Sequence, residues 1–279
     1  MDMEIAFSTN AFKKFSLKDT INALSEIGFK AIEILCDVPH ACPKTLTVYE
    51  VFEIKQLLSK LGMRVSNLNA FTLFAQGDTY HPSWIDSTSD ARKIRIEHTM
   101  DCIKLAHKLG ASNISTEPGG PIINDGLSEK ELLKIFENGL NEILPIAEKE
   151  NVTILVEPEP GLLIENSQQF INFIKNFDSK HIGLNFDIGH FFCVGEDPSE
   201  AVYRLSEYIR HVHLEDIAAS RKHNHLMLGE GAIDISHVLE SLKDVGYDGF
   251  VTIELYPYQE CPVYAAKEAM KFIKSLDYL

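Results

Sequence analysis

The sequence lacks the features that mark disulfide-stabilised, membrane-spanning and secreted proteins. Its five cysteines include no Cys-x-x-Cys pair, which favours free thiols in a reducing compartment. Its longest apolar runs, such as residues 152–156, are strand-sized and fall far short of the roughly 18 residues of a membrane span. The first residues carry neither a basic nor a long apolar stretch, so we expect no secretory signal, no membrane partner and a cytoplasmic location.

A basic surface is also missing. Lys and Arg number 26 against 41 Asp and Glu, which gives a formal net charge of −15, and no basic block interrupts the chain. Proteins that bind a nucleic-acid duplex neutralise its phosphates with clustered Lys and Arg. The composition therefore argues against nucleic acid as the main partner.

What the sequence does contain is a regular alternation of strand-like and helix-like segments. Helical apolar spacing ends repeatedly at a Gly before the next strand, as at Gly62, Gly110 and Gly246. No linker rich in Pro or Ser divides the chain, and no G-x-G-x-x-G fingerprint follows the first strand. The predicted strands are 5–10, 31–36, 64–70, 113–117, 152–157, 182–187, 209–214 and 250–255. The predicted helices are 17–28, 48–62, 90–110, 128–150, 167–177, 198–208, 235–246 and 262–276.

Eight such units within 279 residues favour the α/β class and a single (β/α)8 TIM barrel over residues 1–279, rather than an open doubly wound sheet. Six or seven strands stay open as alternatives, because boundaries read from a sequence are soft. In a (β/α)8 barrel the active site lies at the C-terminal ends of the strands. Polar residues at those ends are therefore the candidates for function.

The fifth to eighth predicted strands each interrupt an apolar run with ionisable side chains near the C-terminal end. These are Glu157 and Glu159, Asp187 and His190, His211, His213 and Glu215, and Glu254. Burying charge there is costly unless it is paired or bound to a metal. A Glu, Asp, His and Glu from four consecutive strands suit one Mn²⁺, Mg²⁺, Co²⁺ or Zn²⁺ ion. Capping or salt-bridging residues are the alternative interpretation.

The second half of the chain resembles the xylose-isomerase-like TIM-barrel superfamily. The strings that carry the resemblance are Glu157-Pro, Phe186-Asp-Ile-Gly-His190, His211-Val-His213-Leu-Glu-Asp, Gly229-Glu-Gly-Ala-Ile-Asp234 and Gly249-Phe-Val-Thr-Ile-Glu254. That superfamily includes sugar and sugar-phosphate isomerases, epimerases of the tagatose 3-epimerase type and, more distantly, endonuclease IV. In this order the strings are specific for the superfamily but poorly specific for the reaction.

The resemblance implies one divalent metal held by Glu157, Asp187, His213 and Glu254, with Glu157 and Glu254 also moving protons. It implies a sugar, sugar phosphate or keto-polyol substrate, deprotonated next to a metal-chelated carbonyl to give a cis-enediolate. The expected enzyme is thus a metal-dependent isomerase or epimerase of carbohydrate metabolism, with manganese among the candidate metals. His190 is expected to contact the substrate from the loop after the sixth strand.

Other residues are candidates for substrate contact. They are Glu117 after the fourth strand, Glu159 after the fifth, and Arg221 and His225 in the loop after the seventh. Arg221 and its neighbour Lys222 could meet a phosphate or carboxylate. His211 is interpreted as a support behind His213. A second metal, which endonuclease IV would require, stays open at Glu117, His223 and His225, but we expect one metal only.

Three other functions are alternatives to the isomerase. A dehydratase or lyase acting on a keto-acid or inosose would use the same metal and base, so the sequence separates it poorly. A nuclease like endonuclease IV fits the net charge of −15 badly. A binding barrel without catalysis conflicts with the complete Glu/Asp/His/Glu set. A homo-oligomer also stays open.

Overall fold

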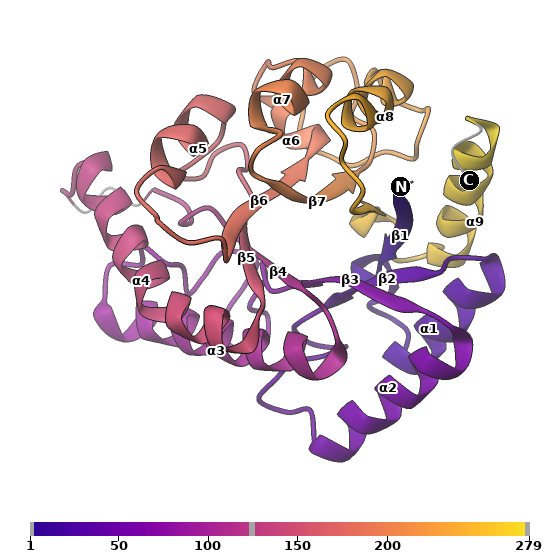
Figure 1. The fold of residues 1–279 in the computed structure, drawn as a ribbon, viewed down its shortest axis with the longest axis horizontal. Coiled ribbons are helices and arrows are strands. Elements are labelled where there is room, and N and C mark those ends of the chain that lie inside the picture. The colour runs from indigo at the N-terminus through magenta and orange to yellow at the C-terminus, as the bar shows by residue number, and fades with distance from the viewer. Residues whose placement is uncertain (1–2, 123–125, 277–279) are drawn as a thin grey trace.

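The computed structural model of the protein describes residues 3–122 and 126–276. Eight strands in chain order form a closed parallel barrel in which β8 pairs with β1 (Figure 1). This confirms the predicted (β/α)8 barrel. The strands are β1 (Glu4–Ser8), β2 (Ala31–Leu35), β3 (Arg64–Asn69), β4 (Asn113–Thr116), β5 (Thr153–Val156), β6 (Ile182–Asp187), β7 (Ile209–Leu214) and β8 (Phe250–Ile253).

The α-helices surround the barrel on its outside (Figure 1). They are α1 (Leu17–Ile27), α2 (Val48–Leu61), α3 (Ser89–Leu109), α4 (Glu129–Glu150), α5 (Ser167–Ile174), α6 (Ile188–Cys193), α7 (Pro198–Leu205), α8 (Ile235–Asp244) and α9 (Pro262–Ser275). Two 3₁₀ helices, η1 (Thr9–Phe12) and η2 (Tyr256–Tyr258), follow β1 and β8.

Local sequence explains where the helices begin and end. Thr47 and Glu50 form a reciprocal capping box at the start of α2, and Gly62 ends that helix in the left-handed conformation at φ 64°. Gly110 ends α3 in the same conformation. The C-terminal glycines are signals on which the predicted helix ends rested, whereas the capping box is seen only in the structure.

Two predicted boundaries were wrong in a way that matters for the site. The first strand stops at Ser8, and η1 turns the chain so that Asn10 faces the barrel mouth. The sequence also did not reveal α6, so His190 lies on a helix rather than in a loop. Asp187 causes this helix to start at once, because its carboxylate accepts a hydrogen bond from the backbone N–H of His190 at 2.8 Å.

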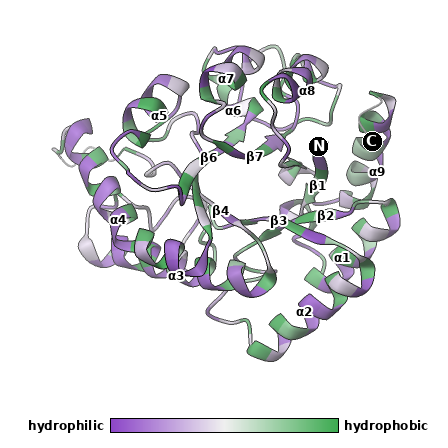
Figure 2. Cartoon of the chain, viewed as in Figure 1, coloured by the Kyte–Doolittle hydropathy of each residue, from purple (hydrophilic) through white to green (hydrophobic). Residues whose placement is uncertain are grey.

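The core lies between the barrel and the helices. The helices carry hydrophobic and hydrophilic residues on different faces (Figure 2), and the apolar faces pack on strands whose residues are mostly buried. Parallel pairing then aligns the C-terminal ends of the strands. Asp187 on β6 lies in register with His213 on β7, which brings these two side chains to the same level of the barrel. Within the described residues, no helix has the length and apolar character needed to cross a membrane.

Candidate active site

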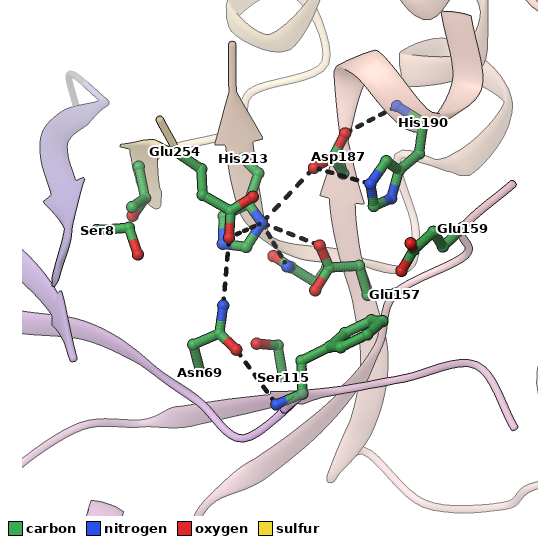
Figure 3. Close-up of polar contacts among 12 residues, drawn as sticks. Ser8, Asn69, Ser115, Glu157, Glu159, Asp187, His190, His213 and Glu254 are labelled. Carbon is green, nitrogen blue, oxygen red and sulfur yellow. Dashed lines mark hydrogen bonds and ion pairs between the residues drawn. The ribbon is translucent and has the colours of Figure 1, made fainter. Parts of the chain in front are cut away.

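The four residues predicted as metal ligands converge on one imidazole nitrogen. Nδ1 of His213 lies 3.0 Å from Oε1 of Glu157, 3.7 Å from Oδ2 of Asp187 and 3.7 Å from Oε1 of Glu254 (Figure 3). All four side chains are buried at the barrel mouth. The structure therefore brings together the complete predicted set, each member from a different strand or the residue that follows it.

The other ring nitrogen of His213 is held by Glu33, a residue that the sequence analysis missed. Nε2 lies 2.7 Å from Oε2 of Glu33, in the middle of β2 on the far side of the barrel. Asn67 on β3 donates a further hydrogen bond to the same carboxylate at 2.8 Å. A carboxylate on the ring nitrogen that does not bind the metal fixes the orientation of a ligand histidine. Glu33 therefore leaves Nδ1 of His213 directed at the three acids.

Burial and the surplus of acids in this cluster shift the pKa of its members. Burial by itself lowers the pKa of His213, but the carboxylates of Glu33, Glu254 and Glu157 outweigh it and raise that pKa well above its usual range. Burial raises the pKa of Glu254 to about 8, and His213 only partly opposes this. A fully buried cluster with more acids than bases needs extra positive charge, which protons or a bound cation can supply.

Orphaned polar atoms support a cation as that charge. Oε2 of Glu157 and Oδ2 of Asp187 are buried without a hydrogen-bond partner. Ligand atoms of Glu157, Asp187 and His213 all lie within 4.8 Å of one another. Buried polar atoms in proteins almost always have a partner, so unsatisfied carboxylate oxygens that face one imidazole suit a divalent metal. The residues present therefore fit the ion that the sequence analysis expected.

A cavity of about 330 Å³ opens above the four ligands. Its wall combines polar and aromatic side chains and includes Glu157 and Glu254 themselves. The other lining residues are Asn10, Lys13, Leu35, Asn69, Phe71, Thr72, Phe74, Thr79, Tyr80, Glu159, His190, His223 and Tyr256. This volume is at the lower end of the range for small-molecule sites.

Two amides on the first half of the barrel hold Glu254. Nδ2 of Asn10 donates to Oε1 of Glu254 at 2.7 Å. Nδ2 of Asn69 approaches the same oxygen at 3.3 Å (Figure 3). Neither amide was a sequence candidate, although Asn10 ends a predicted strand and Asn69 is the penultimate residue of another. An Asn at a strand end is too common a residue to have singled them out.

The loop after β3 covers part of the cavity and is held in place by hydrogen bonds from Arg95. Arg95 on α3 donates to the carbonyl oxygens of Phe71 and Pro82, each at 2.8 Å. From this loop the Tyr80 hydroxyl donates to Oε1 of Glu159 at 2.7 Å. Burial raises the pKa of Glu159 to about 7. Glu159 is thus a buried acid that faces the cavity, as a substrate-contacting residue would be.

Three of the substrate-contact candidates, Glu117, Arg221 and His225, do not line the cavity. Glu117 is fully buried, its Oε1 lies 3.5 Å from Nε of Arg95, and burial raises its pKa to about 8. Arg221 lies over the ring of Phe192 and donates to the Phe192 carbonyl oxygen at 2.6 Å. The packing of these side chains against their own neighbours, which strand-end position cannot reveal, keeps them away from the cavity wall.

His190, His223 and His225 form a second cluster beside the first. His190 and His223 line the cavity, with their Nε2 atoms 3.0 Å apart, and His225 lies behind them. Ligand atoms of all three lie within 4.8 Å of one another. Nδ1 of His225 is 2.9 Å from the Glu254 carbonyl oxygen, while its buried Nε2 has no partner. The cluster is compatible with the second metal left open above, which stays a prediction.

His211 is the support that the sequence analysis expected. Its two ring nitrogens lie 2.7 Å from the side-chain oxygens of Asn185 and Thr252, inside the barrel below His213. Burial lowers the pKa of His211 to about 3. A neutral histidine with both nitrogens occupied packs the barrel interior and offers no free nitrogen to a ligand.

Comparisons with known proteins agree with this architecture. Residues 21–276 match the family model described as xylose isomerase-like TIM barrel. The chain is 30% identical over 265 residues to the uncharacterized protein MJ1311 of Methanocaldococcus jannaschii, covering 91% of this chain and 84% of that protein. It is 24% identical over 290 residues to inosose dehydratase of Clostridium beijerinckii, covering 94% and 90% of the two chains.

Solved structures show the same fold. The crystal structure of a D-tagatose 3-epimerase-like protein has a TM-score of 0.84 and 26% identity, with 98% of this chain and 97% of that chain covered. The structure of IOLI protein with a binding zinc atom has a TM-score of 0.82 and 18% identity, with 99% of both chains covered. The family therefore contains enzymes that modify sugars and related polyols. Together with the family match over residues 21–276, these findings place the chain in the xylose isomerase-like TIM-barrel family.

Proposed function

We propose that the protein is a divalent-metal-dependent isomerase or epimerase of a ketose or keto-polyol. The observation that carries the proposal is the convergence of three carboxylates on Nδ1 of His213 at the floor of the cavity. Glu157, Asp187, His213 and Glu254 would hold one Mn²⁺, Mg²⁺, Co²⁺ or Zn²⁺ ion. Such an ion, when bound, acts as a Lewis acid that polarises a carbonyl group and acidifies the neighbouring C–H.

Glu157 and Glu254 are the proposed proton carriers. They reach the cavity from β5 and β8, so their carboxylates approach a bound substrate from different strands. One carboxylate removes the proton next to the carbonyl, which leaves a cis-enediolate. The other returns a proton to the opposite face in an epimerase, or to the neighbouring carbon in an isomerase. Asn10 and Asn69 keep Glu254 oriented through its Oε1.

Metal analysis and isotope exchange test the proposal together. We expect the purified protein to carry about one divalent ion per chain and to exchange the α-proton of at least one ketose with D₂O, detected by NMR. Exchange reports deprotonation even when the product is unknown. A metal-loaded protein that exchanges no proton on a broad panel of ketoses and keto-acids contradicts the proposal.

A dehydratase or lyase of a keto-acid or inosose is the second candidate. The similarity to inosose dehydratase over 94% of this chain favours it. The same two glutamates would serve, one as the base and one as the acid that protonates the leaving hydroxyl. Loss of water creates a conjugated product, so ultraviolet absorbance separates this reaction from epimerisation, which conserves the formula of the substrate.

A further inference from the structure

Lys13 is a cation at the cavity that lacks an acceptor in the described part of the chain. It follows η1, is only partly exposed and lines the cavity wall. Its ammonium lies 4.5 Å from the centre of the Phe74 ring, and no carboxylate of the described residues forms an ion pair with it. A lysine carries three N–H donors and no acceptor, so a half-buried ammonium over an aromatic ring is left with unused donors.

The two acids that act electrostatically on Lys13 already accept hydrogen bonds from other groups. Burial lowers the pKa of Lys13, while Asp37 and Glu254 act in the opposite direction. Asp37 accepts hydrogen bonds from the backbone N–H groups of Val38, Phe74 and Ala75 and from the Thr72 hydroxyl. Oε1 of Glu254 accepts from two amides. Neither acid therefore serves as the ion-pair partner of this lysine.

The neighbouring lysine shows the usual arrangement. Lys14 forms an ion pair with Glu260, and its side chain is 55% exposed. The two lysines are adjacent in sequence, yet only Lys13 is turned to the cavity. Among the described residues that line this cavity, Lys13 is the one Lys or Arg, whereas Glu157, Glu159 and Glu254 line it as acids. Unlike His190, which faces Asp187 and His223, Lys13 presents an ammonium that no described side chain pairs with, so negative charge on a ligand would satisfy it.

We infer that Lys13 binds a carboxylate or phosphate group of the substrate at the side of the cavity formed by η1 and the loop after β3. The inference rests on the proposed function, since it narrows the substrate from ketoses and keto-polyols in general to anionic ones. It replaces Arg221, which is engaged with Phe192, as the residue that recognises an anion. The Phe74 ring lies against the ammonium at 4.5 Å and helps to hold it at the cavity wall, where partial burial strengthens its interaction with an anion.

Direct binding tests this inference without requiring turnover. Three ligands differ only at one terminal carbon: D-fructose is neutral, D-fructose 6-phosphate carries a phosphate and D-fructuronate carries a carboxylate. D-ribulose and D-ribulose 5-phosphate form a shorter pair. Affinities are measured by calorimetry on the Mn²⁺-loaded protein and on its Lys13→Gln, Lys13→Arg and Lys14→Gln variants. Comparison of the phosphate and carboxylate ligands identifies which anion is preferred.

We expect at least one anionic sugar to bind about tenfold more tightly than its neutral counterpart, because a hydrogen bond to a charged group is among the stronger ones. Lys13→Gln should remove that preference, Lys13→Arg should restore part of it, and Lys14→Gln should leave it unchanged. Equal affinities for neutral and anionic sugars in the unaltered protein, a preference that survives in Lys13→Gln, or no binding of any of these sugars each overturns the inference.

The isotope-exchange experiment tests the proposed reaction independently of the binding measurements that test Lys13. A charge preference that depends on Lys13 without proton exchange would preserve this inference and contradict the proposed reaction. The opposite result is proton exchange on an anionic sugar that the Lys13→Gln variant binds as tightly as the unaltered protein. That result would preserve the reaction and contradict the role of Lys13.

Discussion

The two halves of the barrel mouth differ in the chemistry that they supply. Strands β5 to β8 and the residues that follow them carry the four proposed metal ligands, which contact one another directly. Strands β1 to β3 and their loops carry groups that hold those ligands or face the cavity: Asn10, Lys13, Glu33, Asn69 and Tyr80. The second half therefore carries the groups of the proposed reaction. The first half orients those groups and supplies side chains that would contact the substrate.

Electrostatics separates the histidines by their neighbours rather than by their half of the barrel. Carboxylates raise the pKa of His213 and His190 despite burial. Burial lowers the pKa of His98 and of His211 to about 3 and that of His40 below its usual range. A histidine surrounded by acids is held as a cation or ligand, whereas a histidine packed in the core stays neutral. The predictions below test this division in order of expected effect.

Glu254→Gln should have the largest effect, because it removes a proposed proton carrier of the second half. We expect α-proton exchange to fall by about a thousandfold, the range for loss of a general acid or base, with the fold intact. Exchange rates by NMR and circular dichroism on the same samples check this. Glu260→Gln, at an exposed surface acid, is the control. Full activity of Glu254→Gln on a competent substrate contradicts the role.

Glu33→Gln should have the next largest effect, because Glu33 crosses from the first half to orient His213 at 2.7 Å. Loss of an outer partner of a ligand histidine lowers metal affinity by about 10- to 100-fold. Competition with a chelator measures the metal dissociation constant independently of activity. Lys18 pairs with Glu53 on the surface, so Glu53→Gln is a matched control. An unchanged metal affinity shows that Glu33 serves packing alone.

Tyr80→Phe should have a smaller effect, since it removes one hydrogen bond at the cavity wall. The Tyr80 hydroxyl donates to Glu159 at 2.7 Å, and both side chains line the cavity. A single hydrogen bond contributes about 1 kcal/mol, so we expect KM to rise about fivefold with kcat little changed. Steady-state kinetics on a substrate found by the exchange screen separates the two constants. A change confined to kcat places Tyr80 in the chemical step instead.

His98→Gln should give the smallest effect, visible only in the pH dependence of stability. Burial holds the pKa of His98 at about 3, below its ordinary value of 6.5, so acidification protonates the unfolded chain first. The contribution of His98 is therefore fully present above pH 6.5 and declines as the pH falls towards 3, by up to about 1.4 kcal/mol per pH unit. Urea unfolding between pH 7.5 and 5 should show a shallower pH dependence in the variant. An identical slope means that His98 does not titrate in this way.

The barrel and its strand order could be predicted because the signals are local and repeated. Helix caps such as Thr47 and C-terminal glycines such as Gly62 act within a few residues. The Glu157, Asp187, His213 and Glu254 set could be proposed because acids and histidines interrupt apolar strands at their C-terminal ends, which parallel pairing aligns, and because the surrounding motifs resemble those of xylose-isomerase-like barrels. These conclusions needed no knowledge of which side chains touch.

Long-range packing decided the rest. Glu33 and His213 are 180 residues apart and meet only because the barrel closes, and the turn of η1 separates the cavity-facing Lys13 from the paired Lys14. Arg221 and Glu117 had the residue types of a binding site, but Phe192 and Arg95 engage them away from the cavity. Residue type and strand position establish which chemistry a chain can perform. Which side chain is left unsatisfied, and therefore available to a ligand, depends on contacts between distant segments, because a polar group's partner is set by three-dimensional distance and not by sequence spacing.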